Sequence, residues 1–115
     1  MIAENETANQ TCQKLFTAYF NKYPNAGMQI EADRILICLS DFPLLKQGKP
    51  GGWAGGIIYA LTNHYRRACG IHGLLNKECE AFFGASMETI RKRAATIKDL
   101  LFIRDKVMLQ KFLSQ

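Results

Sequence analysis

The chain has 115 residues, of which 48% are hydrophobic and 22% are charged. That length suits a single globular domain, and the composition excludes extended disorder. The net charge is +5, and residues 53–115 hold the whole excess of basic residues, which favours an anionic partner such as nucleic acid or a phospholipid surface.

The N-terminal segment carries two acidic residues, Glu4 and Glu6, and no basic residue. Secretory signals begin with basic residues and a long apolar run, so we expect a cytoplasmic protein. The longest strictly apolar runs, 35–39 and 57–61, are five residues long. A membrane span needs about 20 apolar residues, so we also expect no contact with a membrane.

Glycine and proline divide the chain into stretches with helical periodicity, which predicts an all-α fold of five to six helices. The first helix is expected over about residues 4–23 and closes at Pro24. The second is expected over about 29–42. Their predicted buried stripes are Cys12, Leu15, Phe16, Tyr19 and Phe20 in the first helix, and Ile35, Leu36, Leu39 and Phe42 in the second.

The third predicted helix, over about 51–68, carries Trp53 and an apolar stretch that ends at Leu61. Four glycines lie near its start, and each costs about 1 kcal/mol of helix propensity relative to alanine. A close approach to neighbouring helices offsets such a cost, so we expect this helix at the centre of the bundle. The glycines are Gly51, Gly52, Gly55 and Gly56.

A helix-turn-helix is predicted over about 74–101. Its first helix spans Leu75–Phe83, Gly84 and Ala85 form the turn, and Ser86 is placed to cap a second helix that begins at Met87. The apolar pattern continues to the C-terminus and predicts a sixth helix. The buried stripe of the second helix is Ile90, Ala94, Ile97 and Leu101.

Two segments carry a resemblance to a known family: KPGGWAGGIIYALTNHY at 49–65 and LLNKECEAFFGASMETIRKRAATIKDLL at 74–101. They resemble the cyclin-like fold of the transcription factor B family, in which a small-residue-rich central helix precedes a helix-turn-helix pair. They are also similar to small bacterial domains of unassigned function. The resemblance implies a single cyclin-like domain over residues 1–115, with one repeat.

No two of the four cysteines form a Cys-x-x-Cys pair; they are Cys12, Cys38, Cys69 and Cys79. The group formed by Cys69, His72 and Cys79 matches no common zinc spacing, so we expect reduced, buried thiols and no metal. His64 and His72 are not paired with an acid or nucleophile at a catalytic spacing. The sequence therefore predicts a protein that is not an enzyme and has no cofactor.

The function that we expect is regulatory DNA binding through the second helix of the pair. Basic side chains would neutralise phosphates while Thr89, Lys92 and Thr96 lie nearest to base edges. The alternative is a solvated helix face without a ligand, since Glu88 and Lys92 can pair with each other along the helix. The phosphate-contacting residues are Lys77, Arg91, Arg93 and Lys98.

A second hypothesis is a protein-interaction adaptor or homodimer. The C-terminal segment is more apolar than one amphipathic face needs, and it would hold a protein segment or a second copy of the chain. The residues of this stripe are Phe102, Ile103, Val107, Met108, Phe112 and Leu113.

Overall fold

The structure is a computed structural model that describes residues 7–40, 49–66 and 75–99. Within these ranges it contains helices and no strand, which confirms the all-α prediction. The described helices are α1 (Ala8–Lys22), α2 (Ala26–Ser40), α3 (Pro50–Arg66), α4 (Asn76–Phe83) and a fifth helix over residues 87–99.

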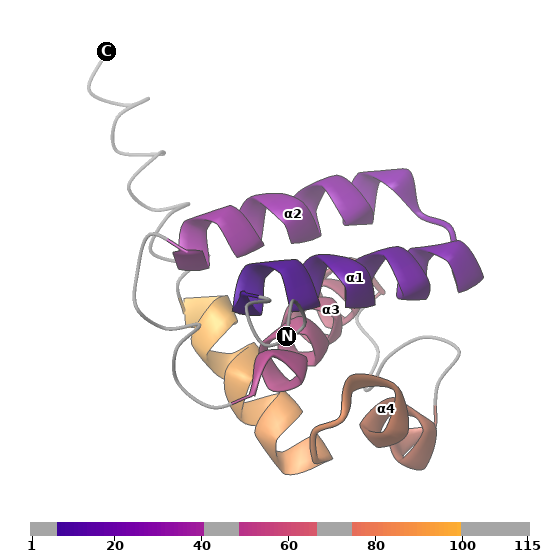
Figure 1. Cartoon of the computed structure of the whole chain (residues 1–115), viewed down its shortest axis with the longest axis vertical. Coiled ribbons are helices and arrows are strands. Elements are labelled where there is room, and N and C mark those ends of the chain that lie inside the picture. The colour runs from indigo at the N-terminus through magenta and orange to yellow at the C-terminus, as the bar shows by residue number, and fades with distance from the viewer. Residues whose placement is uncertain (1–6, 41–48, 67–74, 100–115) are drawn as a thin grey trace.

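The central position predicted for α3 is confirmed. In Figure 1, α1 and α2 run side by side in opposite directions, α3 passes behind α1, and α4 and the fifth helix lie below them. Helix α3 contacts α1, α2 and α4. Its residues from Gly51 to Ile58 are all buried, and Trp53 is 0% exposed. None of the described helices has the length and hydropathy that a membrane span needs.

The two N-terminal helices begin where polar side chains cap them. The Thr7 hydroxyl accepts a hydrogen bond from the Gln10 amide at 3.1 Å, and the Gln10 side chain accepts one from the Thr7 amide at 3.0 Å. This reciprocal capping box starts α1 at Ala8, four residues later than predicted. Asn25 accepts from the Met28 amide at 3.1 Å and starts α2 at Ala26, three residues earlier than predicted.

Most residues of the predicted core stripes are buried where the structure describes them. In α1, Leu15 is half-buried and the other four stripe residues are buried. The α2 stripe is buried as far as Leu39, and Phe42 lies outside the described residues. In α4, Cys79 and Phe83 are buried, but Leu75, which directly precedes the helix, is 73% exposed and does not extend the apolar stripe.

The glycines of α3 lie where the neighbouring helices approach α3 most closely. A Cβ atom at Gly51 would overlap the Phe83 carbonyl oxygen at the end of α4. At Gly56 a Cβ would lie 2.7 Å from the Cβ of Arg93 in the fifth helix. Real Cβ atoms do not approach this closely, so glycine is required for α4 and the fifth helix to dock as they do.

The prediction that the cysteines are buried is right for Cys12 and Cys79 and wrong for Cys38, which is exposed; Cys69 lies outside the described residues. The Cys12 thiol donates to the Pro50 carbonyl oxygen at 3.4 Å, which ties α1 to the start of α3. The core face of α2 is formed by Ile35, Leu36 and Leu39. Cys38 is exposed because it lies outside this face of the helix.

These environments predict the order in which the thiols react. Burial raises the pKa of Cys12 to about 12 and that of Cys79 to about 11, so both remain protonated thiols at neutral pH. The thiolate is the reactive form, and we expect Cys38 to be alkylated at least about 100-fold faster than either. Peptide mass spectrometry after iodoacetamide treatment of the folded protein measures the rates. Equal labelling of Cys12 and Cys38 would contradict the burial of Cys12.

Candidate functional site

The turn between α4 and the fifth helix is built by local interactions. The Glu78 side chain accepts a hydrogen bond from the Leu75 amide at 3.0 Å at the start of α4. Gly84 ends α4 in the left-handed conformation, with φ of 66°, and its amide donates to the Glu80 carbonyl oxygen at 2.8 Å. Glycine adopts this conformation without the steric cost that other residues incur, which confirms the predicted turn.

Two side chains cap the start of the fifth helix. The Ser86 hydroxyl accepts from the Thr89 amide at 3.2 Å, which confirms Ser86 as the N-cap. The Glu80 carboxylate accepts from the Met87 amide at 2.7 Å. A carboxylate at a helix N-terminus makes a charge-assisted hydrogen bond and also complements the helix dipole. The entry to the fifth helix is therefore fixed from two sides, by Ser86 within the turn and by Glu80 from α4.

The predicted buried stripe of the fifth helix is confirmed as far as Ile97. Ile90, Ala94 and Ile97 are buried, and Met87 is buried with them. The opposite face is open to solvent along the whole described length of the helix. Its exposed residues are Glu88, Arg91, Lys92, Ala95, Lys98 and Asp99.

The two threonines predicted near base edges lie on one shoulder of the helix and are half-buried. The Thr96 hydroxyl donates to the Lys92 carbonyl oxygen at 3.3 Å. The Thr89 hydroxyl oxygen lies 3.1 Å from the Ser86 hydroxyl, which donates to it. Thr89 therefore contributes to the capping of the helix as well as to its outer surface.

Arg93 is half-buried and lies against α3, near the core as its phase in the helix predicts. Its guanidinium carbon is 4.5 Å from the centroid of the Trp53 ring. This distance is within the range of a cation–π interaction. The close approach of the Arg93 backbone at Gly56 brings the two side chains together.

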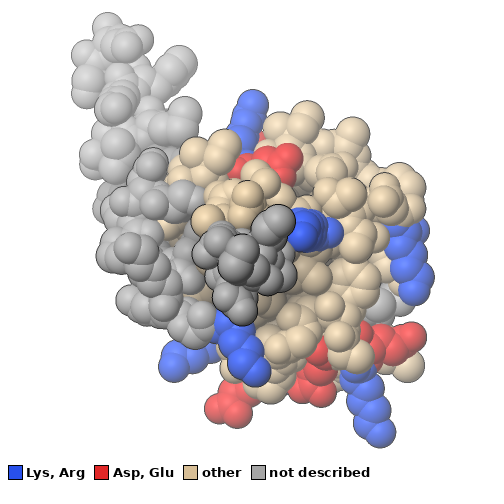
Figure 2. All heavy atoms as spheres, viewed as in Figure 1, with Lys and Arg blue, Asp and Glu red and all other residues tan. Residues whose placement is uncertain are grey.

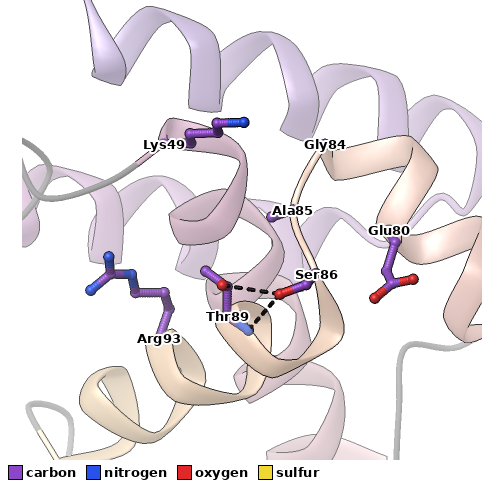
Figure 3. Close-up of a pocket in the computed structure, with 7 residues that line it drawn as sticks. All are labelled: Lys49, Glu80, Gly84, Ala85, Ser86, Thr89 and Arg93. Atoms are coloured by element: carbon purple, nitrogen blue, oxygen red, sulfur yellow. Dashed lines mark hydrogen bonds between the residues drawn. The ribbon is translucent and has the colours of Figure 1, made fainter.

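A hollow of about 590 Å³ opens beside the N-terminus of the fifth helix. Figure 3 shows Lys49 and Arg93 on the Thr89 side of this hollow, with Glu80 beyond Ser86 on the other side. The hollow combines two basic side chains, two hydroxyl groups and one carboxylate. Its lining residues are Lys49, Glu80, Gly84, Ala85, Ser86, Thr89 and Arg93.

Lys49 and Glu80 were not among the predicted site residues. Lys49 immediately precedes Pro50 and reaches the hollow because the start of α3 packs against the turn. Glu80 caps a helix that begins seven residues later. The common capping box has its partners three residues apart, so spacing in the sequence gives no signal for a cap that crosses a turn.

The helix-turn-helix segment, formed by α4 and the fifth helix, has a more balanced charge than the C-terminal half as a whole. Residues 75–99 contain five basic and four acidic residues, so most of the excess lies at Arg66, at Arg67 and in residues 100–115. Figure 2 shows acidic and basic side chains interspersed along the lower edge of the molecule, over α4 and the fifth helix. The outer basic residues of the fifth helix are thus a local cluster, bordered by acidic side chains.

The predicted site residues do not all converge. Thr89 and Arg93 line the hollow, Arg91, Lys92 and Lys98 lie on the outer face of the fifth helix, and Lys77 is exposed near the start of α4. The C-terminal apolar stripe from Phe102 to Leu113, together with Leu101 of the fifth-helix stripe, lies outside the described residues, as do Cys69 and His72. Among the described residues, no three His, Cys, Asp or Glu side chains form a group able to hold a metal ion.

Comparison with protein-family models, curated proteins and solved structures found no significant match. Function is therefore inferred from the residues and the geometry of this chain alone.

Proposed function

We propose that the chain is a cytoplasmic DNA-binding module of regulatory type, in which α4 and the fifth helix act as a helix-turn-helix within a cyclin-like domain. The single observation that carries the proposal is the exposed basic face formed by Arg91, Lys92 and Lys98. This face belongs to a helix that follows a tight glycine turn and is docked firmly on α3. A helix presented in this way is the element that enters the major groove in helix-turn-helix proteins.

In this proposal the residues divide into phosphate contacts and base contacts. Arg91 and Lys98 extend from one side of the outer face toward the phosphate backbone. Lys92 projects most directly into the groove, with Thr89 and Thr96 beside it. Arg93 reaches a phosphate from its half-buried position over Trp53, and Lys77 does so from α4.

Lys49 extends the proposed interface beyond α4 and the fifth helix. Its side chain lines the same hollow as Arg93 and Thr89, at the N-terminal end of the fifth helix. A phosphate at this point would meet two basic groups, Lys49 just before α3 and Arg93 in the fifth helix, so Lys49 is a further candidate for a backbone contact. One domain with so few base-reading side chains binds weakly alone, and two domains on two half-sites are the expected working form.

The test measures binding to a pool of random-sequence duplexes at two or more salt concentrations. We expect the double variant Arg91→Ala, Lys92→Ala to lose affinity and to show a shallower dependence of log K on log salt, by about 0.9 for each phosphate contact removed. Arg93 is left unchanged because its contact with Trp53 contributes to folding. The matched control is Lys14→Ala, Lys22→Ala in α1, which removes the same charge from another helix.

Equal loss in both double variants would mean that only net charge matters, and would contradict a role for the fifth helix. A wild-type chain that fails to bind at low salt would reject DNA binding itself. The adaptor hypothesis, which places a protein partner on the stripe from Phe102 to Leu113, would then take its place.

A further inference from the structure

The outer face of α2 is unusually apolar for a helix face open to solvent. Ile30 is 52% exposed and Ile37 is 62% exposed. They are seven residues apart, which is about two helical turns, so they lie on the same side of the helix. The opposite side, formed by Ala32, Ile35 and Leu39, is packed into the core.

Two opposite charges flank the line that joins these isoleucines. At about 100° per residue, Asp33 lies on one side of the line and Arg34 on the other. Arg34 is 66% exposed and forms an ion pair with Glu31 at 3.1 Å, which uses only one of its five N–H groups. The Asp33 carboxylate has no ion-pair partner among the residues that the structure describes, and partial burial raises its pKa.

We propose that this face of α2 binds a second copy of the same chain, with the two α2 helices packed side by side and parallel about a two-fold axis. In this arrangement Ile30 meets Ile30 of the partner copy, and Ile37 meets Ile37. The two-fold axis also places the acidic side of each helix against the basic side of the other. Asp33 of each copy therefore faces Arg34 of its partner.

Charge complementarity selects this arrangement over the alternative. An antiparallel pair would place Asp33 against Asp33 and Arg34 against Arg34, and like charges in contact are unfavourable. A parallel pair places the Arg34 guanidinium of the partner copy beside the Asp33 carboxylate, which has no ion-pair partner among residues 7–40, 49–66 and 75–99. The inference does not depend on DNA binding, because every group that it uses lies on α2.

The association is expected to be weak. One pair of helices buries less than the roughly 1,200 Å² of a standard specific interface, so a dissociation constant of about 10 to 300 μM is expected. Sedimentation equilibrium of the full chain, in the absence of nucleic acid, covers this range.

Exchange of the two charges is the most specific test. The single variants Asp33→Arg and Arg34→Asp each place like charges in contact twice per dimer, and each should weaken association by at least about tenfold. The double variant with both changes restores opposite charges in the parallel pair and should associate within about threefold of the wild type. A mixture of the two single variants should form a heterodimer.

Ile37→Asp tests the apolar part of the face, and it should also weaken association at least about tenfold. Its matched control is Leu75→Asp, which changes an exposed apolar residue away from α2 and should leave association unchanged. The thermal unfolding of each variant shows whether it is folded. Because both positions are exposed, neither change is expected to lower the unfolding temperature.

Three results would overturn the proposal. The first is a wild-type chain that stays monomeric across the whole concentration range. The second is a double charge exchange that fails to restore association while the variant remains folded. The third is a monomeric Ile37→Asp variant with a large loss of stability, which would show that another part of the same chain covers this face.

Discussion

Replacing Gly51 with alanine is expected to lower the free energy of unfolding by about 3 kcal/mol. The added methyl group would overlap the Phe83 carbonyl oxygen, and this atom belongs to the backbone, so rotation of a side chain cannot relieve the overlap. Alanine is favoured over glycine in a helix by about 1 kcal/mol, and the steric cost must exceed that gain. Urea unfolding followed by circular dichroism gives the difference.

Gly27 in α2 is the matched control for this substitution. A Cβ atom there would meet only the Asn25 side-chain oxygen, at 3.8 Å. Gly27→Ala is therefore expected to leave stability unchanged or to raise it by up to about 1 kcal/mol. If Gly51→Ala behaved in the same way, the close packing of α3 against the end of α4 would be refuted.

Replacing Trp53 with alanine is expected to cost about 3 to 5 kcal/mol, because the indole ring is fully buried at the centre of the bundle. The change leaves a cavity in the core beside α3, and it also removes the ring that lies under the Arg93 guanidinium. A loss of this size is a large part of the roughly 5 to 15 kcal/mol that stabilises a small domain. Chemical denaturation measures the loss.

Two milder variants separate the contributions to this loss. Trp53→Phe retains an aromatic ring and should cost less than Trp53→Ala. Arg93→Ala removes the cation and should cost about 0.5 to 2 kcal/mol in the wild-type background, but less once Trp53 is alanine. Equal effects of Arg93→Ala in the two backgrounds would contradict a direct interaction between the ring and the guanidinium.

The local features of the fold could be predicted because each has a signal within a few residues. The helical periods predicted the buried stripes, and Gly84 followed by Ser86 predicted the turn and the cap. The start of α2 was predicted too late, since Gly27 suggests a loop, whereas the Asn25 side chain begins the helix before it. Cys38 was placed inside by its residue type, although the phase of its helix directs it to solvent.

The interactions around the candidate site could not be predicted, because they join residues that are distant in the sequence. Arg93 meets Trp53 across 40 positions, and the contact depends on the absence of a side chain at Gly56. Lys49, which directly precedes α3, and Glu80 of α4 reach the same hollow from separate parts of the chain. Periodicity identifies which side of a helix is buried, but it does not specify which residue of another helix will lie opposite.

The glycines of α3 also bear on how the chain folds. Four of the first seven residues of this helix are glycine, so this part of the segment has little tendency to become helical alone. Its helical structure must be stabilised by contacts with segments that lie far away along the chain. Formation of α3 and its docking between α1, α4 and the fifth helix are therefore a single cooperative event. Local unfolding that separates α4 and the fifth helix from α3 also unfolds α3.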